Sequence, residues 1–474
     1  MSRKGTEGPN ERKGETTARL GSAGPQMSRQ LELPLGRRGE APRAQRSVEA
    51  PTAAGEEASP GASGLMVLVV ERQNLFAALK RVRQNKGSPG IDGMTVGELP
   101  DWLRVHWPRV REELLSGAYQ PQPVRRQLIP KSGGGQRELG IPTVLDRFIQ
   151  QAILQVLQPL FDPTFSEHSY GFRPGRRAHD AVRAAQRYIQ EGRRWVVDVD
   201  LEKFFDRVNH DVLMGRLAKR IADRTLLGLI RRYLDAGIMA MGVVIERQEG
   251  TPQGGPLSPL LANVLLDEVD KELERRGHAF ARYADDCNVY VRSKRAGERV
   301  MALLQDLFGR LKLRINEAKS AVAKPWTRRF LGYSFWVGPG KRIRLRVAEK
   351  TLGVLKERVR QMTRRTCGRS IEQVVEGLRG YLPGWKSYFS LADTPGVFRE
   401  LDEWLRHRLR ALQLKQWKRG RTIFRELSAR GMSVDNAARV AGNARRWWKN
   451  SAMAINRALP NRYFDGLGLP RLAA

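Results

Sequence analysis

The stretch Phe280-Ala-Arg-Tyr-Ala-Asp285-Asp286-Cys-Asn-Val-Tyr-Val291 decides how the middle of this chain folds. Two short apolar segments flank a pair of adjacent carboxylates, a pattern that predicts two strands joined by a tight turn. Taken alone, such a pair is more typical of a solvated hairpin tip than of a catalytic centre. Two crowded negative charges are costly unless a cation offsets them, so the assignment depends on a second acidic cluster.

That second cluster lies in residues 195–201, Trp-Val-Val-Asp-Val-Asp-Leu. Successive side chains of a strand point to opposite faces, so Asp198 and Asp200 share one face of an otherwise apolar strand. If this strand lies beside the hairpin, three carboxylates converge. Carboxylate oxygens suit Mg²⁺, and two such ions can clamp the attacking and leaving oxygens of a phosphoryl transfer. We therefore predict a two-Mg²⁺ site for phosphoryl transfer at this place in the fold.

The charge of the chain indicates a polyanionic partner. Its 474 residues include 84 Lys and Arg against 50 Asp and Glu, a formal net charge of +34. Nucleic acid is the usual partner of so basic a protein, and the size of the excess disfavours a basic surface kept only for solubility. More than half of the excess lies in residues 341–474, which predicts a dedicated nucleic-acid-binding region there.

Nothing in the sequence indicates a membrane or an oxidising compartment. The longest early apolar run, residues 65–70, is too short to span a bilayer, and residues 1–60 lack the apolar core of a secretion signal. Cys287 and Cys367 are far apart and have no metal-ligand spacing. We expect a soluble cytoplasmic protein with no membrane partner.

The two acidic segments resemble motifs of reverse transcriptases. Tyr283-Ala-Asp-Asp286 resembles their Tyr-x-Asp-Asp signature, and Asp200-Leu-Glu-Lys-Phe-Phe205-Asp resembles their first catalytic motif. The resemblance implies that Asp200, Asp285 and Asp286 are catalytic and bind the metal, with Asp200 as the first metal-binding carboxylate and Asp198 as its neighbour. It also implies that Phe205 is the bulky gate that packs where a ribonucleotide 2′-hydroxyl would sit. A plain core aromatic is the alternative for Phe205.

Further blocks follow in the order of that family. Residues 129–142 resemble its fingers hairpin, residues 251–259 its nucleotide-pocket block, and residues 316–320 its lysine block. The resemblance implies that the incoming nucleotide is bound by Lys131, Arg137, Gln253 and Lys319, together with Phe205. A point charge and a planar guanidinium beside a glycine-rich turn suit a triphosphate.

Two regions narrow the resemblance to bacterial group II intron-encoded proteins. Residues 86–93 resemble a block found upstream of the fingers in those proteins, and residues 378–419 resemble their maturase, or X, domain. Residues 169–176 resemble a template-contacting loop. The nucleic-acid-binding residues expected from these matches and from the basic, tryptophan-containing C-terminal helices are Arg173, Arg176, Arg406, Lys415, Lys418, Arg419, Arg445 and Arg446. The alternative for the tryptophans is a place in a helical core.

The resemblance implies an α+β right-hand polymerase. We expect a disordered tail over residues 1–62, because this segment is poor in aromatic residues and rich in Gly, Pro and charge. Reverse transcriptase fingers and palm built on an antiparallel sheet are expected over residues 63–338. A basic, all-α thumb or maturase domain is expected over residues 339–474.

The function implied is that of an RNA-directed DNA polymerase of a group II intron in the bacterial cytosol or nucleoid. It would bind the intron RNA to assist splicing and copy it into DNA during intron mobility. Its partners would be intron RNA, an RNA template, a DNA primer or target, and deoxynucleoside triphosphates. The C-terminal region has no Cys pairs or His cluster, so we expect the compact type without an endonuclease. A splicing factor without polymerase activity, and a defence or diversity-generating reverse transcriptase, are the alternatives.

Overall fold

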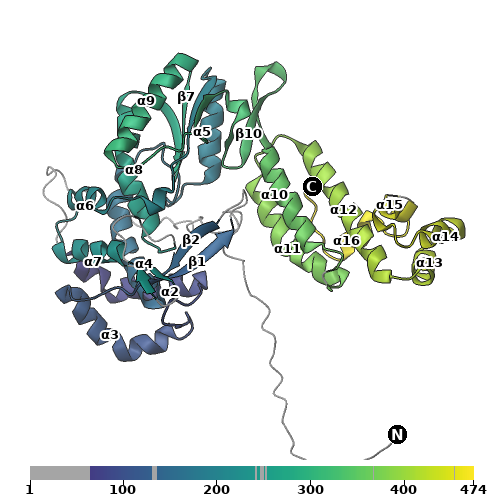
Figure 1. Cartoon of the computed structure of the whole chain (residues 1–474), viewed down its shortest axis with the longest axis horizontal. Coiled ribbons are helices and arrows are strands. Elements are labelled where there is room, and N and C mark those ends of the chain that lie inside the picture. The colour runs from purple at the N-terminus through teal and green to yellow at the C-terminus, as the bar shows by residue number, and fades with distance from the viewer. Residues whose placement is uncertain are drawn as a thin grey trace, which may run out of the picture.

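The computed structural model describes residues 64–130, 136–236, 238–240, 243–245, 250, 254–366, 368–452 and 454–473 (Figure 1). The tail predicted over residues 1–62 lies outside these ranges, as do Lys131 and Gln253. Within them, helices alternate with short, mostly antiparallel strands until Val347, and helices follow to the end. This mixture confirms the predicted α+β class.

The fingers form the lower left part of Figure 1 and combine helices with a small sheet. The helices are α1 (Leu65–Val69), α2 (Arg72–Asn85), α3 (Leu99–Ser116), α4 (Val144–Phe161), α6 (His210–Ala218) and α7 (Arg224–Asp235), with a 3-10 turn η1 (Asp162–Thr164). The sheet has the order β2-β1-β4-β5, with β1 (Val124–Pro130), β2 (Gln136–Ile141), β4 (Ile238–Ala240) and β5 (Val243–Ile245). The antiparallel β1–β2 pair is the hairpin expected from the sequence.

The palm is built on a four-stranded antiparallel sheet of order β6-β7-β3-β8. Its strands are β3 (Trp195–Val199), β6 (Ala279–Tyr283), β7 (Asp286–Val291) and β8 (Ala321–Ala323). The accompanying helices are α5 (Ala178–Gln190), the 3-10 turn η2 (Phe204–Asp206), α8 (Ser258–Arg275) and α9 (Lys294–Arg310).

Alternate residues of the palm sheet enter two different hydrophobic cores. Val197 and Val289 face a first core that contains α8, α9 and the fingers helices. Val196 and Tyr290, one residue along each strand, face a second core that contains α5 and continues into the thumb. The face that carries Val196 also carries Asp198 and Asp200, because side chains alternate along a strand. Asp198 and Asp200 therefore lie on the same face as the buried Val196, the face that packs against the second core.

A three-stranded sheet, β11-β10-β9, joins the palm to the C-terminal helices. Its elements are η3 (Pro325–Thr327), β9 (Arg329–Phe330), β10 (Tyr333–Val337), η4 (Pro339–Lys341) and β11 (Ile343–Val347). The predicted boundary between residues 338 and 339 falls inside this sheet, because β10 pairs with β11 from Tyr333–Val347 to Val337–Ile343. The all-α part begins at α10, a few residues later than the sequence suggested.

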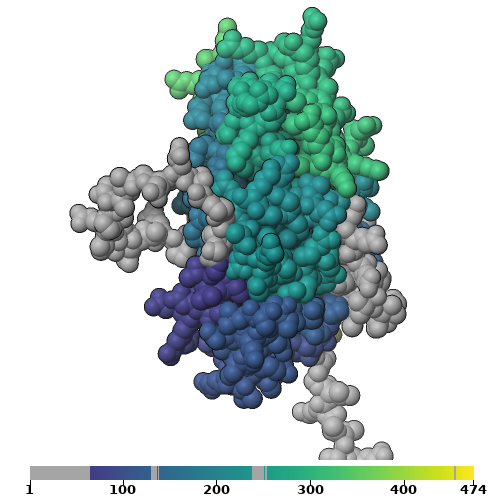
Figure 2. All heavy atoms as spheres, turned by 90° about the vertical axis from the view of Figure 1, so that its left-hand side faces the viewer, coloured from purple at the N-terminus to yellow at the C-terminus, as the bar shows by residue number. Residues whose placement is uncertain are grey.

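The thumb lies on the right of Figure 1, and its described secondary-structure elements are all helices. Its elements are α10 (Glu349–Met362), α11 (Ile371–Tyr388), α12 (Pro395–Trp417), α13 (Gly420–Ala429), α14 (Val434–Gly442), α15 (Trp447–Ser451), η5 (Ala454–Asn456) and α16 (Asn461–Gly466). Figure 2, viewed from the left of Figure 1, shows fingers and palm as one elongated body. Among the described helices, none combines the length and apolarity that a membrane crossing requires.

Candidate active site

The turn between β6 and β7 carries the first candidate carboxylate. Tyr283 pairs with Asp286, so Ala284 and Asp285 form a two-residue turn. Ala284 has φ 57°, a left-handed conformation that is unfavourable for a residue with a Cβ. Such strain persists only where the surroundings enforce it, and it concentrates at functional sites.

The register between β3 and β7 brings the second acidic segment to the same place. Asp198 lies opposite Asn288, and Val199 lies opposite Cys287. Continuing this antiparallel register by one residue sets Asp200 opposite Asp286, on the face that also carries Asp198. The sheet register thus sets the Asp200 and Asp286 positions on neighbouring strands, and the joint binding of a metal by Asp200, Asp285 and Asp286 stays a prediction.

The carboxylates crowd one another electrostatically. Taken over all its atoms, Asp286 is exposed to solvent. However, the protein atoms around its carboxyl group withdraw it from water and, with Asp285, Asp198 and Asp200, raise its pKa to about 7. Burial also raises the pKa of Asp198, against the lowering effect of Arg328. A divalent cation would relieve this excess of negative charge, and carboxylate oxygens are suitable donors for it.

Two basic side chains neutralise part of the cluster. Lys319 donates from Nζ to Asp200 Oδ2 at 2.9 Å, and Arg328 donates from Nε to Asp198 Oδ2 at 2.6 Å. The Ser320 hydroxyl also accepts a hydrogen bond from the Asp200 amide at 3.0 Å. Within the part of the chain that the structure describes, no three Asp, Glu, His or Cys groups stand close enough to hold a metal ion as they lie. A metal bound at Asp200 would compete with the Lys319 ammonium for the negative charge of this carboxylate.

The other predicted nucleotide-binding residues are only partly described. Phe205 follows Asp200 in η2, is half-buried against the first core, and meets Phe204 edge-on at 5.0 Å between ring centroids. This position is compatible with both the gate and the core interpretation. The side chain of Arg137 is not among the described ones, and Lys131 and Gln253 lie outside the described residues.

The loop over residues 169–176 lies against the turn of Ala284 and Asp285, the candidate catalytic turn. A Cβ on Gly171 would lie 2.2 Å from the Ala284 amide nitrogen, so the two backbones are in direct contact. Phe172 has φ 60° and is 48% exposed, with its ring centroid 6.2 Å from that of Tyr283. An exposed aromatic ring therefore stands beside the candidate active site.

The structure corrects the prediction that Arg173 binds nucleic acid. Its side chain is buried and donates to the Asp162 carboxylate at 2.8 Å and to the Ser166 and Ser169 carbonyls at 2.6 and 3.0 Å. A guanidinium so engaged holds its own loop together. Arg176 is less buried and pairs with Glu167 at 2.6 Å, so its nucleic-acid-binding role remains a prediction.

Arg406 in the thumb requires the same correction. It is buried and pairs with Asp402 at 3.3 Å and Asp465 at 3.1 Å, which fixes α12 against α16. The other predicted nucleic-acid-binding residues there reach solvent. Lys415 lies 4.2 Å from the Trp447 ring centroid, while the side chains that are exposed are Lys418, Arg419, Arg445 and Arg446.

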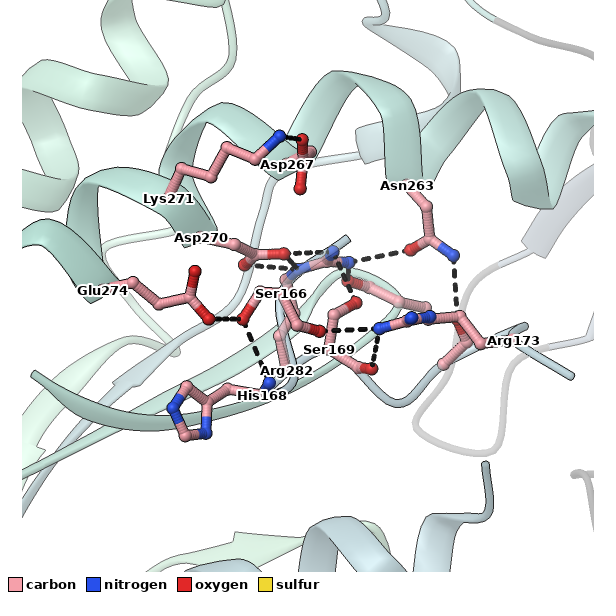
Figure 3. A network of polar contacts seen from close by, with 12 residues as sticks. Ser166, His168, Ser169, Arg173, Asn263, Asp267, Asp270, Lys271, Glu274 and Arg282 are labelled. Carbon is pink, nitrogen blue, oxygen red and sulfur yellow. Dashed lines mark hydrogen bonds and ion pairs between the residues drawn. The ribbon is translucent and has the colours of Figure 1, made fainter. Parts of the chain in front are cut away.

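Sequence inspection missed the residues that hold the candidate catalytic turn. Arg282, one residue before Tyr283, is buried and pairs with the fully buried Asp270 of α8, as Figure 3 shows. Asn263, also on α8, joins the same network. A signal was available, because a buried charge must be paired and Arg282 interrupts an otherwise apolar strand.

Comparisons with known proteins identify the family. A model of the reverse transcriptase (RNA-dependent DNA polymerase) family matches residues 129–335, and a model of the group II intron maturase-specific domain matches residues 353–431. Protein YkfC of Escherichia coli (strain K12) is 35% identical over 301 residues, which cover 54% of this chain and 78% of YkfC. The chain belongs to the group II intron-encoded reverse transcriptase and maturase family.

Two further relatives of this reverse transcriptase and maturase are intron-encoded. Group II intron-encoded protein LtrA of Lactococcus lactis subsp. cremoris is 41% identical over 197 residues, which cover 41% of this chain and 33% of LtrA. The putative COX1/OXI3 intron 1 protein of Saccharomyces cerevisiae is 25% identical over 443 residues, which cover 81% of this chain and 51% of that protein. The chain thus matches about a third of LtrA and half of the yeast protein.

Family membership confirms several of the sequence predictions. The reverse transcriptase domain is that of an RNA-directed DNA polymerase, and it implies a dependence on divalent metal. Together with the maturase domain, it implies RNA and nucleic-acid partners. The absence of an endonuclease and the cytoplasmic location remain predictions.

Proposed function

We propose that this chain copies group II intron RNA into DNA by nucleotidyl transfer that depends on two Mg²⁺ ions held by Asp200, Asp285 and Asp286. The observation that carries the proposal is the β3–β7 register, which sets the Asp200 position beside Asp286 and next to the turn of Asp285. The electrostatic influence of Asp285 and Asp200 on Asp286 supports the same grouping.

The side chains have separable roles in this proposal. The three carboxylates hold the ions, which when bound stabilise the negative charge that develops on the attacking and leaving oxygens. Lys319, released from Asp200, is free to approach the phosphates of an incoming deoxynucleoside triphosphate. Phe205 lies in the 3-10 turn η2 that follows Asp200, where its ring can exclude a 2′-hydroxyl.

The thumb supplies the surface for the intron RNA in this proposal. Exposed cations lie at the end of α12 and just before α15, beside the half-buried Trp447 and the 44% exposed Trp448. Cations of this kind neutralise phosphates, and an exposed indole can stack on an unpaired base. This surface would let one protein assist splicing and then copy the same RNA.

The test is primer extension on an RNA template with Mg²⁺ and deoxynucleotides. Asp285→Ala should abolish synthesis, while Asp306→Ala should leave it unchanged, because Asp306 is an exposed partner of Arg310 on α9. Folding of both variants is checked by thermal unfolding. If the wild type binds intron RNA tightly but extends no primer, the protein is a splicing factor and the polymerase proposal fails.

A further inference from the structure

Arg282 uses its whole guanidinium group inside the protein. Nε donates to Asp270 Oδ1 at 2.8 Å, and Nη2 donates to Asp270 Oδ2 at 2.5 Å. Nη2 also donates to Ser169 Oγ at 2.8 Å. Nη1 donates to Asn263 Oδ1 at 3.0 Å and to the Ala284 carbonyl at 2.9 Å. These contacts employ all five N–H groups that an arginine has.

The bond to the Ala284 carbonyl reaches the catalytic turn itself. Ala284 precedes Asp285 and holds the unfavourable left-handed conformation that orients it. Because the Asp270 carboxylate holds the Nε–Nη2 edge of the guanidinium in a bidentate ion pair, the position of Arg282 is fixed by α8 and not by the turn. Arg282 thus ties the peptide before Asp285 to helix α8, a rigid element outside the sheet.

Asn263 extends the same network to the loop beside the turn. Its Nδ2 donates to the Gly171 carbonyl at 2.9 Å, while its Oδ1 accepts from Arg282 (Figure 3). Gly171 touches the Ala284 backbone, and Phe172 next to it exposes its ring beside Tyr283. One helix therefore holds both the turn with the carboxylate and the loop with the exposed ring.

We infer that Arg282, held by Asp270 and Asn263, is a positioning residue that sets where Asp285 stands relative to Asp200 and to the loop of Gly171 and Phe172. The inference rests on the proposed polymerase function, and it adds residues that touch neither substrate nor metal. If the pair served folding alone, apolar residues of similar volume could replace it without loss of function.

The central experiment removes the pair without leaving a lone buried charge. Arg282→Met combined with Asp270→Leu keeps the volume and eliminates both charges. We expect its melting temperature to stay near that of the wild type and its primer–template affinity to stay within about twofold. Because the turn is released, kcat should fall by about 10–100-fold and the Mg²⁺ concentration for half-maximal rate should rise.

A second readout reports the metal site without relying on polymerisation. Fe²⁺ bound in place of Mg²⁺ cleaves a polypeptide near its ligands when ascorbate and peroxide are added. Cleavage near residues 200 and 285 should occur in the wild type and fall severalfold in the double variant. If the wild type polymerises nothing but is still cleaved there, the proposed function fails while the positioning role is still tested.

The matched control is Arg216→Met with Glu268→Leu. This pair also joins α8 to another element, but it leads to α6 and away from the catalytic turn. We expect kcat, the Mg²⁺ midpoint and the cleavage pattern of this control to remain those of the wild type. Arg282→Lys provides a charge-only test, since a single ammonium cannot make the five contacts, and it should not restore kcat.

Three results would overturn the inference. They are a folded double variant with wild-type kcat and Mg²⁺ midpoint, full rescue by Arg282→Lys, and a loss of activity that merely follows the unfolded fraction. If the double variant does not fold, Asn263→Ala decides, because it keeps the ion pair and removes only the bonds from Asn263 to Arg282 and to Gly171. An unchanged kcat and Mg²⁺ midpoint in folded Asn263→Ala would then overturn the inference.

Discussion

Asp286 bears a clear electrostatic cost in the folded chain. Burial and the neighbouring carboxylates raise its pKa to about 7, whereas an unfolded aspartate has a pKa of about 3.9. A carboxyl pKa that is higher in the folded state destabilises the fold when the group is ionised. The cost is complete above pH 7 and disappears as the pH falls from 7 toward 4.

We expect Asp286→Asn to stabilise the metal-free protein at alkaline pH. In EDTA at pH 8 its melting temperature should exceed that of the wild type by about 2–4 °C, and the difference should shrink toward zero as the pH falls to 4. Thermal unfolding at several pH values measures it. Asp306→Asn, which changes an exposed carboxylate on α9, should show no such pH-dependent gain. A constant difference across the range would contradict the electrostatic account.

Gly171 is a single residue whose missing side chain matters. The nearest backbone atoms of the catalytic turn would lie 2.2 and 2.9 Å from an added Cβ, closer than real contacts allow. Gly171→Ala should therefore displace the turn and lower primer extension by about 10–100-fold, with most of the fold intact. Gly215→Ala on α6 is the control, because nothing lies within 4 Å of its added Cβ. Equal activities of the two variants would refute this contact.

The carboxylates were predictable from the sequence because strand alternation alone sets which side chains share a face. The alternation of side chains along a strand is enough to place Asp198 and Asp200 on one face. The apolar segments on both sides of Asp285 and Asp286 are enough to predict the hairpin. Arg282 was less accessible, because its partner Asp270 comes from a neighbouring helix. The pairing depends on how α8 crosses the sheet, which local patterns do not specify.

At the scale of the element, α12 shows why charge clusters mislead. The helix has buried Leu405 and Leu409 beside Arg406, and Asp402 stands one turn before that arginine. Charge density along the sequence marked Arg406 as a nucleic-acid contact. Arg406 is buried because α16, which comes later in the chain, packs over it and pairs with it through Asp465. The exposed residues 418–419 and 445–446 were predicted by the same criterion, which explains why sequence alone could not rank them.

The segment before α15 should contribute salt-dependent RNA affinity. If Arg445 and Arg446 each contact a phosphate, as proposed, replacing both by alanine removes two such contacts. The slope of log affinity against log salt should become shallower by about 1.4–1.8. Filter binding of intron RNA at several KCl concentrations measures this slope. Lys294→Ala with Arg310→Ala, two exposed cations on α9, should leave the slope unchanged; an equal effect would indicate non-specific attraction.

At the scale of the whole molecule, palm and thumb share one hydrophobic core. Phe389 at the end of α11 is buried, with its ring centroid 5.1 Å from Tyr333 of β10 and 4.8 Å from Trp385. His179 at the start of α5 contacts the Tyr388 carbonyl at 2.6 Å. Because these contacts cross the predicted domain boundary, the thumb and the α5 face of the palm should unfold together.

Phe389→Ala tests that coupling. Loss of a buried phenyl ring should cost about 3–5 kcal/mol of unfolding free energy. Hydrogen exchange should show protection falling in α5 as well as in α11. Phe76→Ala, which removes a 60% exposed ring on α2, should change neither. Loss of protection confined to α10–α16 would mean that the thumb is an independent folding unit.

The second core also bears on how such proteins can be recombined. Its wall is formed by α5, which lies about 160 residues before the thumb helices that it supports. A chimaera that exchanges the maturase region at the end of the linking sheet would therefore join a foreign thumb to a resident α5. A functional exchange of thumbs between relatives should require that α5 and β9–β11 be exchanged together with the thumb. The segment that must be exchanged as a unit is therefore discontinuous in sequence.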